Sequence, residues 1–111
     1  MSEMAISFIR ECTKRGLIDF SEHSIIRMTE RELEKDRVIE CIVEGKVIES
    51  QEHSQDIIVL FQEATETYPE FYVVVAAAYP YPEVLTVCRF KKEAWEYSSG
   101  LMRRRKKYGH Q

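Results

Sequence analysis

The hydrophobic pattern of this chain changes period once, at Gly45, and that change limits the folds it can form. Three segments before Gly45 repeat their apolar residues at helical spacing: about 3–15, 22–30 and 35–44. Four segments after it are short, apolar and extended: about 47–51, 57–63, 71–78 and 84–90. Their hairpin-length connections favour neighbouring antiparallel strands. The sequence therefore predicts an α+β domain, with two to three N-terminal helices packed on a four-stranded antiparallel sheet.

The C-terminal part carries a different pattern. Residues 93–102 are amphipathic, and we expect a short C-terminal helix there. Residues 103–111 open with five consecutive basic side chains and read as a disordered tail. We therefore place a single domain at 1–102 and a basic tail at 103–111. The tail could contact RNA, contact a membrane surface, or only increase solubility.

Length and composition limit the classes of protein to which the chain can belong. A chain of 111 residues with 44% hydrophobic residues has the composition of one globular domain. Acidic residues and Arg10 interrupt the apolar residues at the start, which argues against a secretory signal or a membrane span. Cys12, Cys41 and Cys88 are odd in number and widely spaced, so we expect free thiols in a reducing cytoplasm.

Charge is distributed unevenly along the chain. Residues 1–100 hold 11 basic and 19 acidic side chains, a balance of −8, whereas the last eleven residues carry +5. No Lys or Arg occurs between Lys46 and Arg89, against seven acidic residues. Positive surface is thereby confined to the N-terminal helices, the segment after Arg89 and the tail. Such a body does not suit binding of nucleic acid across the whole sheet.

A polar stripe on the second predicted helix is the strongest functional signal. His23, Arg27 and Arg31 follow one another at four-residue steps, so they fall on one face of the helix. Histidine changes charge closest to neutral pH, and guanidinium groups match phosphate oxygens in pairs. The stripe can therefore handle a phosphate. It can also be an ordinary solvated face, with Arg27 paired to Glu30 and Arg31 to Glu34.

Several motifs in order give the chain a resemblance to a known family. The run His23-x3-Arg27-Met28-x2-Arg31, the helix ending at Gly45, and Leu85-Thr86-Val87-Cys88-Arg89 followed by Trp95 span most of the domain. This pattern resembles a prokaryotic family of small domains of unknown function. That family is similar to toxin ribonucleases of the RelE and barnase–EndoU–colicin kind.

The resemblance implies a metal-independent ribonuclease, or an RNA-binding relative of one, that needs no cofactor. It carries over His23, Arg27, Thr86 and Arg89 as the catalytic positions. His23 would move a proton as general base or acid, and the two arginines would stabilise the charged phosphate. The residues expected to bind substrate are Arg31, Tyr79, Tyr81, Trp95, Arg103, Arg104 and Arg105, the aromatic ones by stacking on bases.

A second reading, from another class, stays open. The stripe and tail could serve a non-catalytic interaction or regulatory module of a toxin–antitoxin-like system, with an antitoxin-like protein as partner. The acidic body favours this reading, because toxin ribonucleases tend to be basic. Whether His23, Arg27 and Arg89 converge in one pocket would separate the two readings. The oligomeric state, the substrate and the second proton-transfer group do not follow from the sequence.

Overall fold

The computed structural model of this protein describes residues 2–53 and 55–106. Three helices come first, and the two-residue strand β1 (Asp19–Phe20) lies between the first two: α1 (Glu3–Lys14), α2 (Glu22–Glu30) and α3 (Lys35–Glu44). Six strands follow: β2 (Lys46–His53), β3 (Asp56–Gln62), β4 (Phe71–Ala76), β5 (Glu83–Arg89), β6 (Trp95–Ser98) and β7 (Leu101–Arg104).

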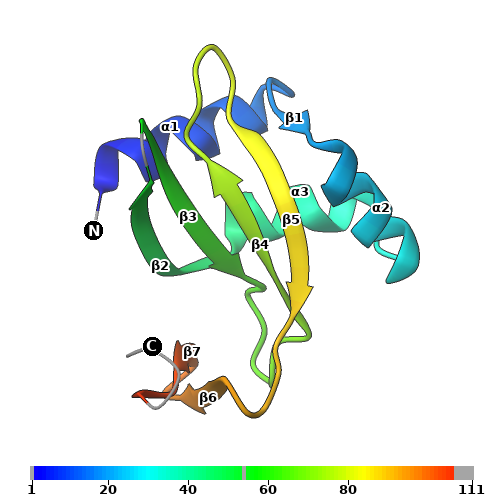
Figure 1. The fold of residues 1–111 in the computed structure, drawn as a ribbon, viewed down its shortest axis with the longest axis vertical. Helices are drawn as coiled ribbons and strands as arrows, with labels where there is room; N and C mark the ends of the chain where they lie inside the picture. The colour runs from blue at the N-terminus through cyan, green and yellow to red at the C-terminus, as the bar shows by residue number, and fades with distance from the viewer. Residues whose placement is uncertain (1, 54, 107–111) are drawn as a thin grey trace.

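Five strands form one mixed sheet in the order β1-β5-β4-β3-β2 (Figure 1). Strands β2 to β5 pair antiparallel with their neighbours in the chain, which confirms the predicted meander and the α+β class. Strand β1, which was not predicted, pairs in parallel with the start of β5 through Asp19 and Phe20. Strand β5 also carries a bulge, because Val75 and Val74 pair with Val84 and Thr86 and leave Leu85 out of register.

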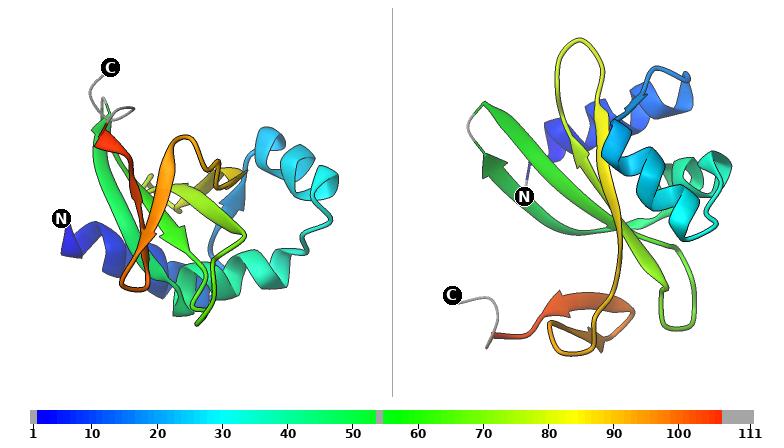
Figure 2. Two further views of the ribbon diagram at one scale, coloured as in Figure 1. Left: turned by 90° about the horizontal axis from the view of Figure 1, so that it is seen from below. Right: turned by 45° about the vertical axis from the view of Figure 1, so that its right-hand side comes forward.

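The helices cover only one face of this sheet. Seen from below, α1 and α3 lie along one side of the strands, while α2 stands beside the β5 edge (Figure 2). The core between helices and sheet is apolar and almost fully buried: Ile9, Met28, Val38, Cys41, Ile42, Val59, Phe61, Phe71, Val73, Val75, Val84 and Val87. In the described part of the chain no helix lies on the opposite face, which we call the open face; the hairpin of β6 and β7 packs on part of it.

Gly45 makes the turn from α3 into β2 for a steric reason. A Cβ atom at this position would lie 2.2 Å from the backbone oxygens of both Cys41 and Gln62. Only glycine therefore allows the helix to end this close to β3. The change of sequence period at Gly45 thus coincides with a junction between helix and sheet that leaves no room for a side chain.

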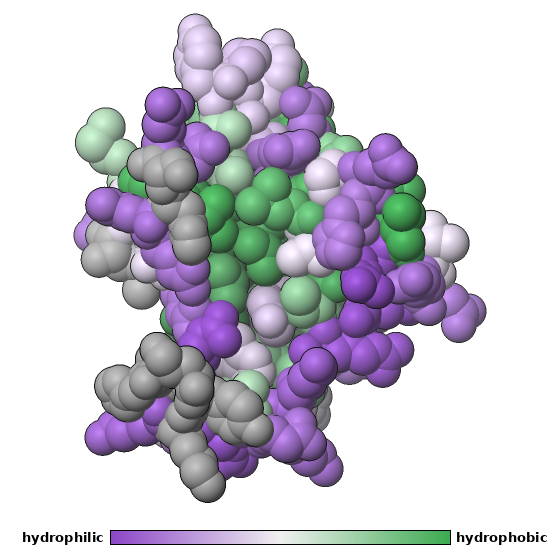
Figure 3. Space-filling model, in the orientation of Figure 1, coloured by the Kyte–Doolittle hydropathy of each residue, from purple (hydrophilic) through white to green (hydrophobic). Residues whose placement is uncertain are grey.

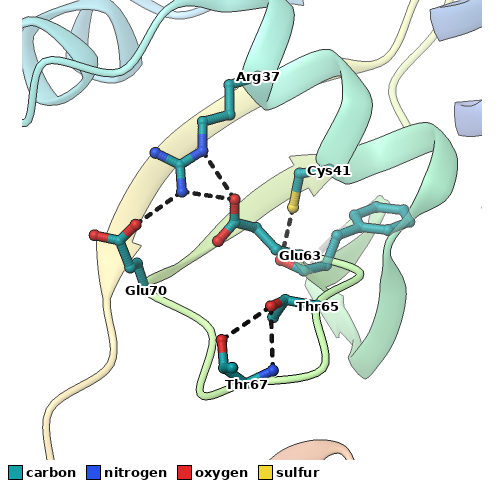
Figure 4. Close-up of polar contacts among 7 residues, drawn as sticks. Arg37, Cys41, Glu63, Thr65, Thr67 and Glu70 are labelled. Atoms are coloured by element: carbon teal, nitrogen blue, oxygen red, sulfur yellow. Dashed lines mark hydrogen bonds and ion pairs between the residues drawn. The ribbon is translucent and has the colours of Figure 1, made fainter.

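A salt-bridge network ties α3 to the loop between β3 and β4 (Figure 4). The Arg37 guanidinium lies 2.8 Å from a carboxylate oxygen of Glu63 and 2.8 Å from one of Glu70. Its hydrogen bond to Arg37 holds the pKa of the Glu70 carboxyl below its usual range. Beside this network, Cys41 donates to the Phe61 carbonyl at 3.6 Å. All three cysteines are free, as expected.

The C-terminal segment is a hairpin, so the predicted short helix over 93–102 is wrong. Ser99 and Gly100 form its turn with φ of 53° and 85°, and β6 and β7 pair on either side. The buried Gln62 side chain fixes the hairpin to the sheet, donating to Gly100 O at 2.9 Å and accepting from Met102 N at 2.8 Å. Met102 and Trp95 are buried with Leu60 in a second apolar cluster.

The predicted boundary between domain and tail also needs correction. It falls inside β7, since Arg103 and Arg104 are strand residues, and Arg105 bonds back to Lys92 O at 2.8 Å. The disorder predicted for the rest of the tail concerns residues 107–111, which lie outside the described residues. In the described part of the chain, no helix has both the length and the apolar content that a membrane crossing requires.

Candidate functional site

Ser21 fixes α2 against β5 and so positions the helix that carries the polar stripe. It is the N-cap of α2: its Oγ accepts from Ser24 N at 3.0 Å and donates to the carbonyl of Leu85 at 2.9 Å. Its backbone N–H donates to Val84 O at 3.0 Å. One residue therefore starts the helix and attaches it to the bulged part of β5. His23 follows two positions later, in the first turn of α2.

A cleft of about 590 Å³ lies between α2, β5 and the C-terminal hairpin. Helix α2 and the residue that caps its C-terminal end contribute His23, Arg27 and Arg31, and β5 contributes Thr86 and Arg89. All four residues carried over from the resemblance thus line one hollow, although more than sixty positions separate His23 from Arg89. The further lining residues are Tyr72, Val87, Cys88, Lys91, Ala94, Trp95 and Arg104.

The charge of this cleft has one sign. Among the described residues no Asp or Glu lines it, whereas five Arg and Lys side chains do: Arg27, Arg31, Arg89, Lys91 and Arg104. Arg27 is paired with Glu30 at 2.8 Å, as the plain helix-surface reading predicted. Neither Arg89 nor Lys91 forms a side-chain ion pair within the described residues. The cleft is therefore an anion-attracting hollow on a protein whose net charge is negative.

Arg31 is the most unusual side chain in the cleft. It caps α2 with non-helical backbone angles, and the expected pair with Glu34 is not formed. Its Nε and Nη1 atoms are buried and have no hydrogen-bond partner in the part of the chain that the structure describes. Burying donors of a charged group without a partner is costly. An acceptor could reach these atoms only with a shift of the side chain, from the cleft or from a smaller hollow that Arg31 lines with Arg37, Glu70 and Arg89.

Arg104 enters the cleft from the hairpin. Its guanidinium lies 4.6 Å from the centre of the Trp95 ring, and its Nε is 2.6 Å from a Glu49 carboxylate oxygen. These two contacts hold the side chain between the hairpin and β2. Arg104 was predicted to bind substrate as part of a basic tail, whereas the structure places it on an ordered strand.

Tyr72 and Cys88 add chemistry that the sequence analysis missed. Burial, and secondarily Cys88, raises the pKa of the Tyr72 phenol well above its usual value, so the hydroxyl stays protonated. Its ring is held by Phe90 and Trp95, with ring centres 4.8 and 5.1 Å away. The missed signal was strand parity, because Thr86 pairs with Val74, two positions from Tyr72, on the same face of the sheet.

Four predicted substrate-binding residues lie outside the cleft. Tyr79 and Tyr81 are exposed in the turn between β4 and β5, at the opposite end of the sheet from the hairpin (Figure 1). Arg105 pairs with Glu96 at 3.2 Å, and Arg103 is exposed on β7. Trp95 does line the cleft, but only 3% of it is exposed, so it cannot stack broadly on a base as predicted. It supports Arg104 and Tyr72 instead.

The cleft offers no metal-binding set. Among the described residues, no three His, Cys, Asp or Glu side chains gather closely enough to hold a metal ion. The groups in the cleft that can exchange a proton are His23, Tyr72, Cys88 and Lys91. This arrangement can bind an oxyanion and move protons at it through side chains alone.

Comparison with known proteins gives the family and nothing finer. No curated protein and no solved structure matches the chain significantly. One family model, described as a domain of unknown function (DUF4258), matches residues 20–93, from β1 to just before β6. The match includes α2 and β5, the two elements that contribute most to the cleft, and leaves out the hairpin with Arg104. Because the match covers more than half of the chain, this protein belongs to the DUF4258 family.

Proposed function

We propose that the cleft binds an RNA phosphodiester and that the protein is a metal-independent, toxin-like ribonuclease or an RNA-binding relative of one. One observation carries this proposal: a histidine and five cations line a single hollow to which no described carboxylate contributes. The unpartnered Arg31 donors support it, since a phosphate oxygen could satisfy them after a shift of the side chain. RNA is favoured over DNA because RNA carries its own nucleophile, the 2′-hydroxyl. A side chain can activate this group without a metal ion.

Groups that line the cleft can supply and remove every proton that the cleavage step requires. The 2′-hydroxyl oxygen attacks the adjacent phosphorus while the bond from phosphorus to the 5′-oxygen breaks. His23 takes the proton of the 2′-hydroxyl, and Arg27, Arg31 and Arg89 stabilise the charge on the phosphate. The products are a 2′,3′-cyclic phosphate and a free 5′-hydroxyl. Thr86 orients a phosphate oxygen from β5.

Tyr72 completes this scheme as the donor to the leaving oxygen. A phenol that remains protonated at neutral pH always has its proton available. The leaving 5′-alkoxide is far more basic than a phenolate, so the transfer is favourable even from a phenol with a raised pKa. Cys88, which contributes to that raised pKa, lies next to Thr86, its Sγ 4.0 Å from Oγ1.

A cleavage assay on the purified protein tests the proposal. Single-stranded RNA in EDTA should yield 2′,3′-cyclic phosphate ends, and RNA with a 2′-deoxy nucleotide at the cut site should resist. His23→Ala should lower the rate by about 10²–10⁴-fold, and Tyr72→Phe should lower it too, while thermal stability stays close to wild type. The matched control is Tyr68→Phe, which changes an exposed tyrosine that does not line the cleft. Cleavage that survives His23→Ala would sink the catalytic reading.

A non-catalytic interaction module is the second candidate, and one observation favours it. Ile25 and Ile26 on α2 are 37% and 49% exposed, an apolar pair on the helix that carries the cationic stripe. An antitoxin-like partner could contact both features at once. Ile26→Asp should abolish partner binding under this reading and leave RNA binding intact under the first. RNA that binds in the cleft without being cut would identify a relative that has lost catalysis.

A further inference from the structure

A second hollow lies on the open face of the sheet, beside the cleft. It measures about 380 Å³, and its floor consists of apolar side chains from three neighbouring strands: Ile58, Leu60, Val74 and Leu85. Gln51, Tyr72 and Arg104 complete its lining. In the space-filling view this region is a continuous apolar area at the centre of the open face, flanked by hydrophilic side chains (Figure 3). We call this hollow the apolar groove.

The apolar groove and the cleft adjoin. Tyr72 and Arg104 line both hollows, so these two side chains form the border between the cleft and the groove. The cleft is cationic and the groove is apolar on its floor. Two adjoining subsites of this kind fit a molecule with an anionic group and a flat, weakly polar body attached to it.

We propose that the apolar groove holds the nucleobase of the nucleotide whose phosphate occupies the cleft. This inference rests on the proposed function and names a subsite for it. A base has an apolar π-face that suits the floor, and it stacks favourably on aromatic rings and guanidinium planes. Tyr72 and Arg104 supply one of each at the border of the two hollows. Tyr72 and Arg104 thereby take the role of stacking on bases that the sequence predicted for Tyr79, Tyr81 and Trp95.

The lining residues are held in place before any ligand arrives. Trp95 and Phe90 pack against the Tyr72 ring, and Trp95 also lies under the Arg104 guanidinium. Glu49 fixes the guanidinium from β2. Because the floor is aliphatic, it presents no fixed pattern of hydrogen-bond partners to a base. The groove should therefore accept purines and pyrimidines with little preference.

Binding of small ligands to the intact protein tests this without requiring catalysis. Inorganic phosphate, ribose 5-phosphate and adenosine 5′-monophosphate are titrated by calorimetry into wild type, Leu85→Asn and Val74→Thr. Leu17→Asn is the matched control, because Leu17 is partly exposed after α1 and lines neither hollow. We expect the mononucleotide to bind wild type about tenfold or more tightly than ribose 5-phosphate. Leu85→Asn should remove most of that gain, and inorganic phosphate should bind all variants alike.

The outcomes separate this inference from the proposed function. Equal affinity for mononucleotide and ribose 5-phosphate, or a gain that survives both groove variants, would overturn the nucleobase subsite. Adenosine, which lacks the phosphate, is titrated as a fourth ligand: if inorganic phosphate fails to bind while adenosine binds wild type and not Leu85→Asn, the groove stands and the phosphate cleft falls. If Leu85→Asn does not fold, Val74→Thr decides, because it keeps the side-chain shape. Sedimentation that shows a wild-type dimer dissociated by Val74→Thr would assign the groove to a second copy and defeat the proposal.

Discussion

The two faces of the sheet are built on different principles. The face under α1 and α3 buries its central apolar side chains completely, with Val59, Phe61, Val73 and Val75 all at 0% exposure. The open face buries Leu60 under the hairpin but leaves Ile58, Val74 and Leu85 only half-buried. Stability is thus concentrated on one side of the strands, which leaves part of the other side available to a ligand.

Truncating the core should give the largest effect and should spare the cleft. Phe61→Ala removes a fully buried ring that also lies under the Arg10 guanidinium, at 5.4 Å. We expect a loss of about 3–5 kcal/mol in the free energy of unfolding, measured by urea denaturation. Phosphate affinity of the remaining folded protein should be unchanged. Leu85→Ala on the open face is the counterpart, with a smaller stability loss because fewer buried contacts disappear.

Loss of the link between sheet and hairpin should have an intermediate effect. Gln62→Ala removes both hydrogen bonds that fix the hairpin and leaves Met102 N and Gly100 O without those partners. We expect about 1–3 kcal/mol of destabilisation. Hydrogen exchange at Met102 should accelerate more than at Val73, and phosphate affinity should fall because Arg104 and Trp95 depend on the hairpin. Gln55→Ala, an exposed glutamine of the β2–β3 turn, is the control.

The hairpin also marks where the sequence was misread. The three helices and the β2–β5 meander were predictable because their apolar residues keep one period over whole elements. In residues 93–102 the apolar residues fit a helical period as well as two short strands. The Ser99-Gly100 pair between two four-residue runs was the available signal, since both residues take the positive φ of a hairpin turn. What stabilises this hairpin is contact with Leu60 and Gln62, distant positions that local patterns do not reveal.

The residues of the cleft also divide into those that the sequence predicted and those that it did not. The stripe of α2 followed from helical spacing, and Thr86 and Arg89 followed from the family resemblance. Tyr72 was hidden inside a run that is apolar on both faces, where nothing in the sequence tells which face stays open. Arg104 was named, but as part of a tail. Its position depends on Glu49, more than fifty residues earlier, so only the assembled fold could show it.

Alkaline pH should lower the free energy of unfolding through one buried thiol, that of Cys41. Burial, and secondarily the charge of Glu63, raises the pKa of Cys41 to about 12, whereas the unfolded thiol ionises near pH 9. The raised folded pKa means that the unfolded state alone loses this proton above pH 9, so stability falls from there until about pH 12. At pH 10 wild type should lose about 1.4 kcal/mol that Cys41→Ala does not lose.

Denaturation curves at pH 7 and pH 10 check this, with Cys12→Ala as the control. That variant keeps Cys41 and should keep the wild-type loss. A Cys41→Ala protein that loses as much stability as wild type would show that the thiol is not the group responsible. Because the thiol faces the core, the phosphate affinity of the cleft at pH 7 should not respond to Cys41→Ala.

The smallest stability effect should come from a pair that borders the cleft. Arg27 and Glu30 form an exposed ion pair at 2.8 Å, with side chains 41% and 53% exposed. Glu30→Gln should cost less than about 0.5 kcal/mol of unfolding free energy, because solvent screens such pairs. It should nonetheless tighten phosphate binding several-fold, since Glu30 competes with the ligand for the Arg27 guanidinium. The gain should shrink as salt is raised.

Glu11→Gln provides the matched control for this comparison. Glu11 pairs with Lys14 at 3.6 Å with the same three-residue spacing, but on α1, away from the cleft. Both substitutions remove one negative charge from an exposed helix, so a general effect of net charge would change phosphate affinity equally in the two variants. A gain confined to Glu30→Gln would place the anion at Arg27. Equal gains would mean that the cleft attracts phosphate only through the overall charge of the molecule, and the contrast between the two faces would then be one of packing alone.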